Sequence, residues 1–206
     1  MHKYTGKLMI GLITVLLIFI GLNQNISAQD QNLADMIEVR TTDSSNDADA
    51  EQMIERLNNV DSRILYETNR SGVSIILMDV PLTDLPEFQH LSGTVPRGWE
   101  QSGSTWDDVP GAGGFTTAAR IGYSDAGNGH STINLELHEY AHAVDSYTAG
   151  FTFSSTSEFN EIMAAEKNAL FGDHQVSEYF DVPSEYFAEV FAMYYLDGKE
   201  RDKLQS

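Results

Sequence analysis

The stretch INLELHEYAHAVDSY, residues 133–147, constrains this chain more than any other part of the sequence. It carries two of the six histidines, His138 and His142, which stand four residues apart, with Glu139 next to the first. Four residues advance about 400° around an α-helix, so the two imidazoles project from one face, one turn apart. The apolar positions that would pack this helix into a core are Ile133, Leu137, Ala141 and Val144.

This spacing is typical of the H-E-x-x-H arrangement of zinc metallopeptidases. Two imidazoles so placed bind one metal ion together, and Glu139 reaches a water molecule in the open coordination position and takes its proton. The same five letters also occur by chance in helices that bind no metal. The apolar opposite face of the helix and the glycine-rich turn before it favour the metal site.

A catalytic zinc site needs a third protein ligand and leaves the fourth position for water. The metzincin pattern would require glycine at position 145 and histidine at position 148. It is excluded because these residues are Asp145 and Thr148. His130 and His174 lie in Gly- or Asp-rich loops, and we expect both to face solvent.

The better candidate is Glu185 in SEYFAEVFAMYYL, which shares one face of a helical pattern with Glu189. Buried carboxylates are costly unless they are paired or bind a metal. One of the two would bind zinc, and the other would accept a hydrogen bond from a liganding histidine. The alternative is the solvated acidic face of an amphipathic helix. The residues that would bury this face are Phe187, Phe191 and Tyr194.

Apolar periodicity and turn residues predict both helices and strands. The expected helices cover residues 50–60, 131–146, 154–171 and a segment from about Pro183, and the expected strands cover 72–80 and 115–123. Ser155 and Glu158 form a capping box for the third of these helices. Residues 81–114 hold four of the five prolines and are expected to be loop.

The first 28 residues have the order of a secretory signal peptide: a basic start, fifteen uncharged residues and small residues before Gln29. We expect secretion, with cleavage near Ala28 and no membrane association afterwards. An uncleaved anchor is disfavoured because a spanning helix needs about 20 apolar residues. Residues 29–50 are acidic and expected to be loosely ordered, which leaves 51–206 for one zinc metallopeptidase domain.

Charge and cysteine content exclude several classes of function. Cleavage removes Lys3 and Lys7 and no acidic residue, so the formal charge of −19 becomes −21. Such a surface repels nucleic acid, which we exclude as a partner. The chain has no cysteine, which excludes thiolate zinc sites and thiol nucleophiles. An exported chain of this kind must be stabilised by its core, a bound metal, or both.

Four blocks of the sequence carry a family resemblance: SGTVPRGWEQSGSTWDDVPGAGG, ARIGYS, INLELHEYAHAVD and EYFAEVFAMYYL. In this order they resemble the secreted Pro-Pro endopeptidases of Gram-positive bacteria, single-domain relatives of the catalytic domain of anthrax toxin lethal factor. The resemblance covers roughly residues 72–200. It implies an α+β fold with a single zincin-like metallopeptidase domain. Such a domain has a small sheet with an edge strand along the cleft, and an H-E-x-x-H helix packed on a second ligand-bearing helix.

The resemblance also implies roles for individual residues. His138, His142 and Glu185 match the ligands of one Zn²⁺ per chain, and Glu139 matches the general base. Tyr179 matches a tyrosine that stabilises the oxyanion, although five residues separate it from the third ligand where the family has six.

The remaining matches concern the surroundings of the metal site. Tyr186 is the fallback for the oxyanion role, and Glu189 and Asp145 are expected to support the ligands. The peptide would lie extended along the strand at 115–119, adding a strand to the sheet edge. The residues expected to bind substrate are Trp106, Gly113, Gly114, Phe115, Thr116 and Thr117.

Together these assignments imply a secreted, monomeric zinc metalloendopeptidase that cleaves proline-rich extracellular or cell-surface proteins between two prolines. One alternative is a catalytically inactive zinc-binding adhesion or toxin-accessory module of the same fold. A non-metal surface protein and a secreted protease of broader specificity are further alternatives. The family continues past YYL with a stretch that includes a final helix. Either this protein lacks that helix or the C-terminal end of the sequence is truncated.

Overall fold

The computed structural model describes residues 33–97, 99–100, 102–172, 178–196, 198 and 204. The predicted signal peptide, residues 1–28, and the candidate His174 lie outside these residues. Within the described part of the chain, no helix combines the length and the apolar character needed to cross a membrane.

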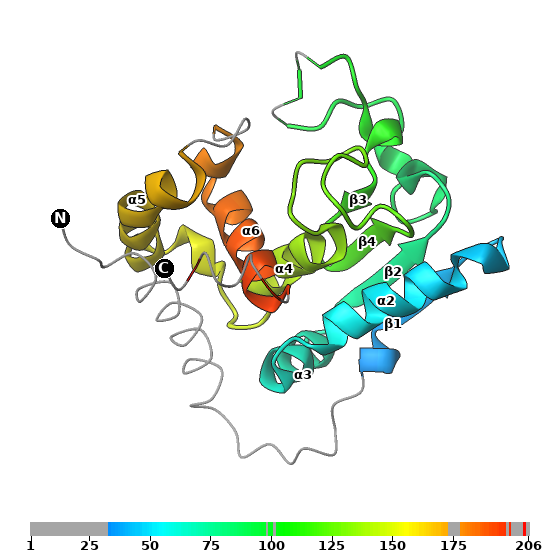
Figure 1. The fold of residues 1–206 in the computed structure, drawn as a ribbon, viewed down its shortest axis with the longest axis horizontal. Helices are drawn as coiled ribbons and strands as arrows, with labels where there is room; N and C mark the ends of the chain where they lie inside the picture. Colours follow the sequence, from blue (N-terminus) through cyan, green and yellow to red (C-terminus); the bar gives the residue numbers. More distant parts are fainter. Residues whose placement is uncertain are drawn as a thin grey trace.

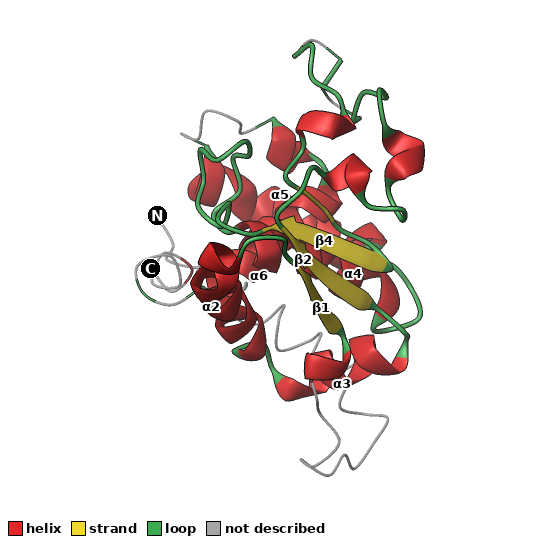
Figure 2. Ribbon diagram, turned by 90° about the vertical axis from the view of Figure 1, so that its right-hand side faces the viewer, coloured by secondary structure: helices red, strands yellow, loops and turns green. Residues whose placement is uncertain are grey.

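The fold contains one four-stranded sheet with the order β1-β2-β4-β3. β1, β2 and β4 are parallel, whereas β3 runs antiparallel to β4 and forms one edge. Figure 2 shows β1, β2 and β4 side by side. The bounds of the strands are Ile37–Arg40 (β1), Ser74–Met78 (β2), Gly111–Ala112 (β3) and Thr116–Arg120 (β4).

Both faces of the sheet are buried at β2. Ile75 and Leu77 of β2 belong to the larger apolar cluster, which is shared with the helices, and Ile76 and Met78 belong to a smaller one. Side chains alternate between the two faces of a strand, so a continuous apolar run such as SIILM is typical of a strand covered on both sides.

The helices pack in layers around α4. α4 contacts β4 on one side and α6 on the other, and α5 lies beyond α6 (Figure 1). The H-E-x-x-H helix therefore packs on a second helix that carries candidate ligands, and the predicted α+β class is confirmed. The bounds are Asp47–Asn58 (α2), Ser62–Arg70 (α3), Leu135–Tyr147 (α4), Ser157–Phe171 (α5) and Pro183–Tyr195 (α6).

The expected loose order of residues 29–50 is wrong from residue 33 onward. β1 pairs with β2, with Ile37 opposite Ile75, and α2 begins at Asp47. The polar turn between β1 and α2 is held by Asp79, whose Oδ2 accepts hydrogen bonds from Thr41 Oγ1 (2.8 Å) and the Thr42 amide (2.7 Å). The Thr42 amide is the main cause that lowers the pKa of Asp79 to about 2. This polar segment is ordered because the Asp79 carboxylate accepts hydrogen bonds from the side chains and amides of the turn.

Two details of the helices also differ from expectation. α3 was not predicted, since its charged residues obscure the short apolar face formed by Ile64 and Leu65. The capping residue of α5 is Thr156, whose Oγ1 accepts from the Phe159 amide, and not Ser155, which lies in a preceding 3-10 turn.

Glu166 is the one acidic residue on the buried face of α5. It shares this face with Phe159 and Met163 and is 1% exposed. Both of its carboxylate oxygens are buried without a hydrogen-bond partner among the described residues. Burial raises the pKa of Glu166 from 4.5 to about 7.

Replacing Glu166 by methionine should therefore stabilise the fold, and more so at neutral than at acidic pH. Below pH 4.5 Glu166 is neutral in both states. Between pH 4.5 and 7 it ionises only in the unfolded chain, so the wild type loses stability as pH rises. The gain of the variant should grow over this window by about 2–3 kcal/mol, the free energy that corresponds to the difference between the two pKa values. Denaturant unfolding at pH 4.5, 6 and 8 measures this gain, and a pH-independent gain would contradict the assignment.

Candidate metal centre and catalytic site

The beginning of α4 is fixed by polar contacts. The side-chain oxygen of Asn134 accepts a hydrogen bond from the Leu137 amide (3.0 Å) and caps the helix. In the first turn of the helix, the buried carboxylate of Glu136 forms an ion pair with Arg56 of α2 (2.5 Å). The part of the chain before residue 60 therefore helps to fix the helix that carries both site histidines.

His138, His142 and Glu185 come together between α4 and α6. Their candidate ligand atoms all lie within 4.8 Å of one another. Glu185 Oε2 is 3.2 Å from His138 Nε2 and 3.3 Å from His142 Nε2. Two imidazole nitrogens and one carboxylate oxygen suit a tetrahedral zinc ion with one position left for water. The donor set thus fits the metal that the motif indicates.

Glu189 lies behind this cluster, one helical turn after Glu185. Its Oε2 is 3.1 Å from His138 Nδ1, and its Oε1 accepts a hydrogen bond from the Ile133 amide (2.9 Å). If Nδ1 donates to Glu189, the Nε2 lone pair of His138 is free for a metal ion. These contacts are consistent with the expected roles, in which Glu185 binds the metal and Glu189 accepts a hydrogen bond from His138.

The charges of the cluster compensate one another. Burial would lower the pKa of His138, but hydrogen bonds with Glu185 and Glu189 raise it to about 10. Burial would raise the pKa of Glu185, but hydrogen bonds with His138 and His142 hold it below its usual value. A divalent cation would replace the proton of His138 as the partner of the carboxylate.

Glu139 lies beside β3 and the segment that follows it. Burial raises the pKa of its carboxyl, and a hydrogen bond from the Gly113 amide opposes this shift. The backbone at Gly113 passes very close to α4. A Cβ atom there would lie 2.5 Å from the Glu139 carbonyl oxygen and 2.6 Å from His142 Cβ. Gly113 was expected only to bind substrate. Its close approach to α4 also leaves no room for a side chain.

Tyr179 reaches the same cluster from the 3-10 turn η7 (Tyr179–Asp181). Its hydroxyl donates to Glu185 Oε2 (2.5 Å), and its ring is stacked on that of His138 with 6.5 Å between the centroids. Burial raises its pKa, so the hydroxyl stays protonated and able to donate. The fallback Tyr186 is fully buried among aromatic residues of the core. The five-residue spacing is therefore long enough for Tyr179 to reach Glu185.

Two of the residues expected to support or border the site make other contacts. Asp145 accepts hydrogen bonds from the amide and the hydroxyl of Ser154, each at 2.6 Å, and so holds a neighbouring turn rather than a histidine. His130 does not face solvent as expected, because its two ring nitrogens contact Thr132 Oγ1 (2.7 Å) and the Tyr123 carbonyl (2.6 Å).

The strand expected at the sheet edge is an inner one. β4 has β2 on one side and β3 on the other, so the edge is formed by β3. Thr117 is buried and donates to the Gly114 carbonyl (3.1 Å), while Thr116 contacts Ser74 (3.4 Å). The side chain of Thr117 is therefore not available to a peptide.

The two aromatic residues of the expected substrate set lie apart. Trp106 packs on the smaller apolar cluster, which includes Ala112 of the edge strand. Phe115 is half exposed and meets Tyr147 at the end of α4 edge to face, with 5.5 Å between ring centroids. Trp106 thus lies on the side of the sheet that carries the smaller cluster, whereas Phe115 lies at the C-terminal end of α4.

Comparisons with known proteins agree with this geometry. The family described as anthrax toxin lethal factor, N- and C-terminal domain, matches residues 25–206. The chain is 42% identical over 178 residues to the Pro-Pro endopeptidase of Clostridioides difficile (strain 630), covering 86% of this chain and 79% of that protein. It is 41% identical over 179 residues to the Pro-Pro endopeptidase of Paenibacillus alvei, covering 86% and 81%.

The fold matches a solved structure as well. The structure of the Pro-Pro endopeptidase PPEP-2 from Paenibacillus alvei superimposes with a TM-score of 0.75 at 40% identity, covering 84% of this chain and 91% of the other. Family, sequence and fold therefore agree over most of the length of both proteins. The chain belongs to the anthrax toxin lethal factor family and, within it, to the Pro-Pro endopeptidases, which are peptide-hydrolysing enzymes.

Proposed function

We propose that this protein is a secreted zinc endopeptidase that cleaves proline-rich extracellular or cell-surface proteins between two prolines. The observation that carries the proposal is the convergence of His138, His142 and Glu185 next to Glu139, in a chain of this family. The names of the two relatives support the choice of a bond between prolines. Zinc is supported by the donor set of two imidazoles and one carboxylate.

The residues around the donor set suggest a division of roles. When bound, zinc supplies Lewis acidity and lowers the pKa of its water from 15.7 to about 7. The carboxylate of Glu139 would accept a proton from the attacking water and deliver it to the leaving nitrogen. Tyr179 donates to the developing oxyanion, a role supported by the position of its hydroxyl, 2.5 Å from Glu185 Oε2. Glu189 orients His138 through Nδ1.

The substrate would lie along β3, the edge strand beside Glu139. Proline has no amide N–H, so strand pairing alone does not select a Pro-Pro bond. The selection requires the shape and the apolar walls of the cleft. We assign Trp106 to the apolar wall that would contact the prolines, because it packs on the cluster that contains Ala112 of β3.

Secretion rests on the sequence of residues 1–28, and we propose cleavage near Ala28 and a monomeric mature enzyme. The peptidase domain is proposed to begin at about residue 33 rather than 51, because β1 is a strand of the sheet. An export assay with the natural leader tests the first point by N-terminal sequencing of the protein in the medium.

The activity is tested with purified residues 29–206 and a library of peptides that contain Pro-Pro flanked by varied residues. We expect cleavage between the prolines, loss of cleavage after chelation, and recovery when zinc is added back. A matched library with Ala-Ala in place of Pro-Pro is the control for broader specificity. A folded, zinc-loaded protein that leaves every peptide intact would favour the inactive accessory module instead.

A further inference from the structure

Tyr179 belongs to η7, a turn that is too short to hold its own conformation. η7 is a three-residue 3-10 turn, held internally by bonds from the Asp181 amide to the Glu178 carbonyl (3.1 Å) and from the Val182 amide to the Tyr179 carbonyl (3.3 Å). Isolated turns of this length have little stability of their own. The position of the Tyr179 hydroxyl therefore depends on what η7 packs against.

Two contacts join η7 to one face of α5. Phe180 is fully buried and stacks on Phe171, with 4.4 Å between ring centroids and 29° between ring planes. Asp181 forms an ion pair with Lys167. Lys167 and Phe171 are four residues apart, so they lie on the same side of the helix. The two residues after Tyr179 are thus each held by one residue of α5.

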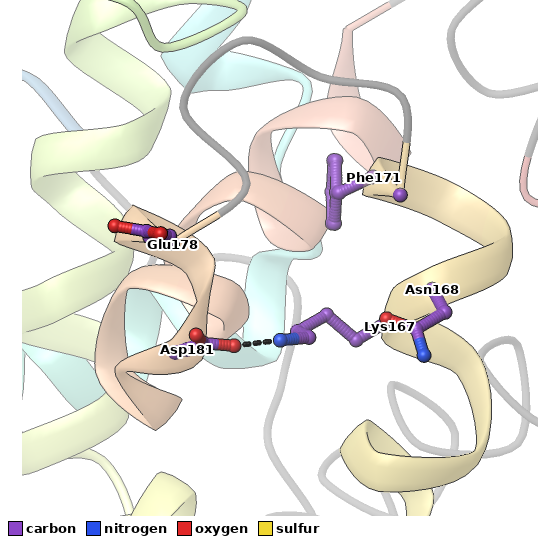
Figure 3. Close-up of a pocket in the computed structure, with 6 residues that line it drawn as sticks. Lys167, Asn168, Phe171, Glu178 and Asp181 are labelled. Carbon is purple, nitrogen blue, oxygen red and sulfur yellow. Dashed lines mark ion pairs between the residues drawn. The ribbon is translucent and has the colours of Figure 1, made fainter.

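A pocket of about 90 Å³ lies between α5 and the turn, and Figure 3 shows Lys167 reaching towards Asp181 along it. The aromatic stack and the ion pair hold η7 against α5, and η7 also packs on α6, which begins two residues after Asp181. The residues that line the pocket are Lys167, Asn168, Phe171, Gly172, Glu178 and Asp181.

From these contacts we infer that Lys167 and Phe171 are positioning residues for Tyr179, acting through Asp181 and Phe180. The inference rests on the proposed role of Tyr179 in the reaction. Phe171 belongs to the core, whereas the side chains of Lys167 and Asp181 are 22% and 57% exposed. The ion pair is partly exposed, so its loss should cost little free energy of unfolding, and its effect should be confined to the position of η7.

The test exchanges the two charges and measures kcat, KM, zinc content and Tm with a Pro-Pro peptide. Lys167→Glu and Asp181→Lys should each lower kcat about fivefold to twentyfold, which is part of the effect of losing one oxyanion donor. KM, zinc content and Tm should stay close to wild type. The double variant restores the opposite charges and should recover kcat to within about threefold.

A Tyr179→Phe background separates positioning from a general structural effect. If Lys167 acts through the tyrosine, Lys167→Glu should cause no further loss of kcat in this background. An equal loss with and without the hydroxyl would overturn the inference, as would wild-type kcat in both single variants. The conservative Lys167→Arg should retain activity. A wild-type enzyme that cleaves no Pro-Pro peptide would instead overturn the proposed function, and the inference with it.

Discussion

Replacing Glu139 by glutamine is expected to lower kcat for a Pro-Pro peptide by about 10²–10⁴-fold, while zinc content stays at one ion per chain. The amide keeps the size of the side chain and an oxygen that accepts from the Gly113 amide, but it cannot take a proton from water. Glu139 is not one of the three clustered ligand residues, so the metal site should remain. Steady-state kinetics and metal analysis of the same preparation measure the two effects.

The matched control for this experiment is Glu161→Gln. Glu161 lies on the exposed side of α5, outside the cluster, and the same chemical change there should leave kcat unchanged. Near wild-type kcat in Glu139→Gln would show that another group accepts the proton. Loss of zinc together with activity would instead assign Glu139 to the metal site itself.

Replacing Gly113 by alanine is expected to have a comparably large effect for a different reason. The added methyl group would lie 2.5 Å from a backbone oxygen of α4 and 2.6 Å from His142 Cβ, so β3 and the histidine helix must separate. Overpacking of this kind costs about 1–3 kcal/mol or more, and a shift of about 1 Å at a catalytic group can reduce the rate 10²-fold. We expect a lower Tm, weaker zinc retention and at least a 10²-fold loss of kcat/KM.

The neighbouring Gly114 provides the comparison. A Cβ atom there meets only the Thr116 carbonyl oxygen, at 3.9 Å, although its φ of 153° makes a side chain unfavourable. Gly114→Ala therefore tests backbone strain without the collision. Zinc retention should be lost in Gly113→Ala and kept in Gly114→Ala, and equal zinc retention in the two variants would argue against close packing as the cause.

The histidine pair and Glu139 were predictable from the sequence because their relation is local. Helical spacing alone puts His138 and His142 on one face. Glu185 is 47 residues from His138, so its arrival at the same place depends on how α4 packs on α6. The sequence pattern favoured Glu185 as the third ligand, and the family resemblance assigned the supporting role to Glu189.

The residues that sequence reasoning missed owe their roles to contacts between distant elements. Gly113 was assigned to substrate by the family resemblance, yet the constraint on it comes from α4. Lys167 and Phe171 fall within an ordinary helical pattern and gain meaning only opposite η7. The direction of Thr117 was also not predictable, because alternation along a strand does not say which face is the cleft.

The pairing of β1 with β2 has a practical consequence for work with this enzyme. A fragment cut at residue 51 would lack Ile37–Arg40 and leave the backbone of β2 bare along one side. An uncovered, flat, apolar strand is a template for association with other chains, so such a fragment would tend to aggregate. Shortened forms intended for crystallisation or screening should therefore keep residues 33–50.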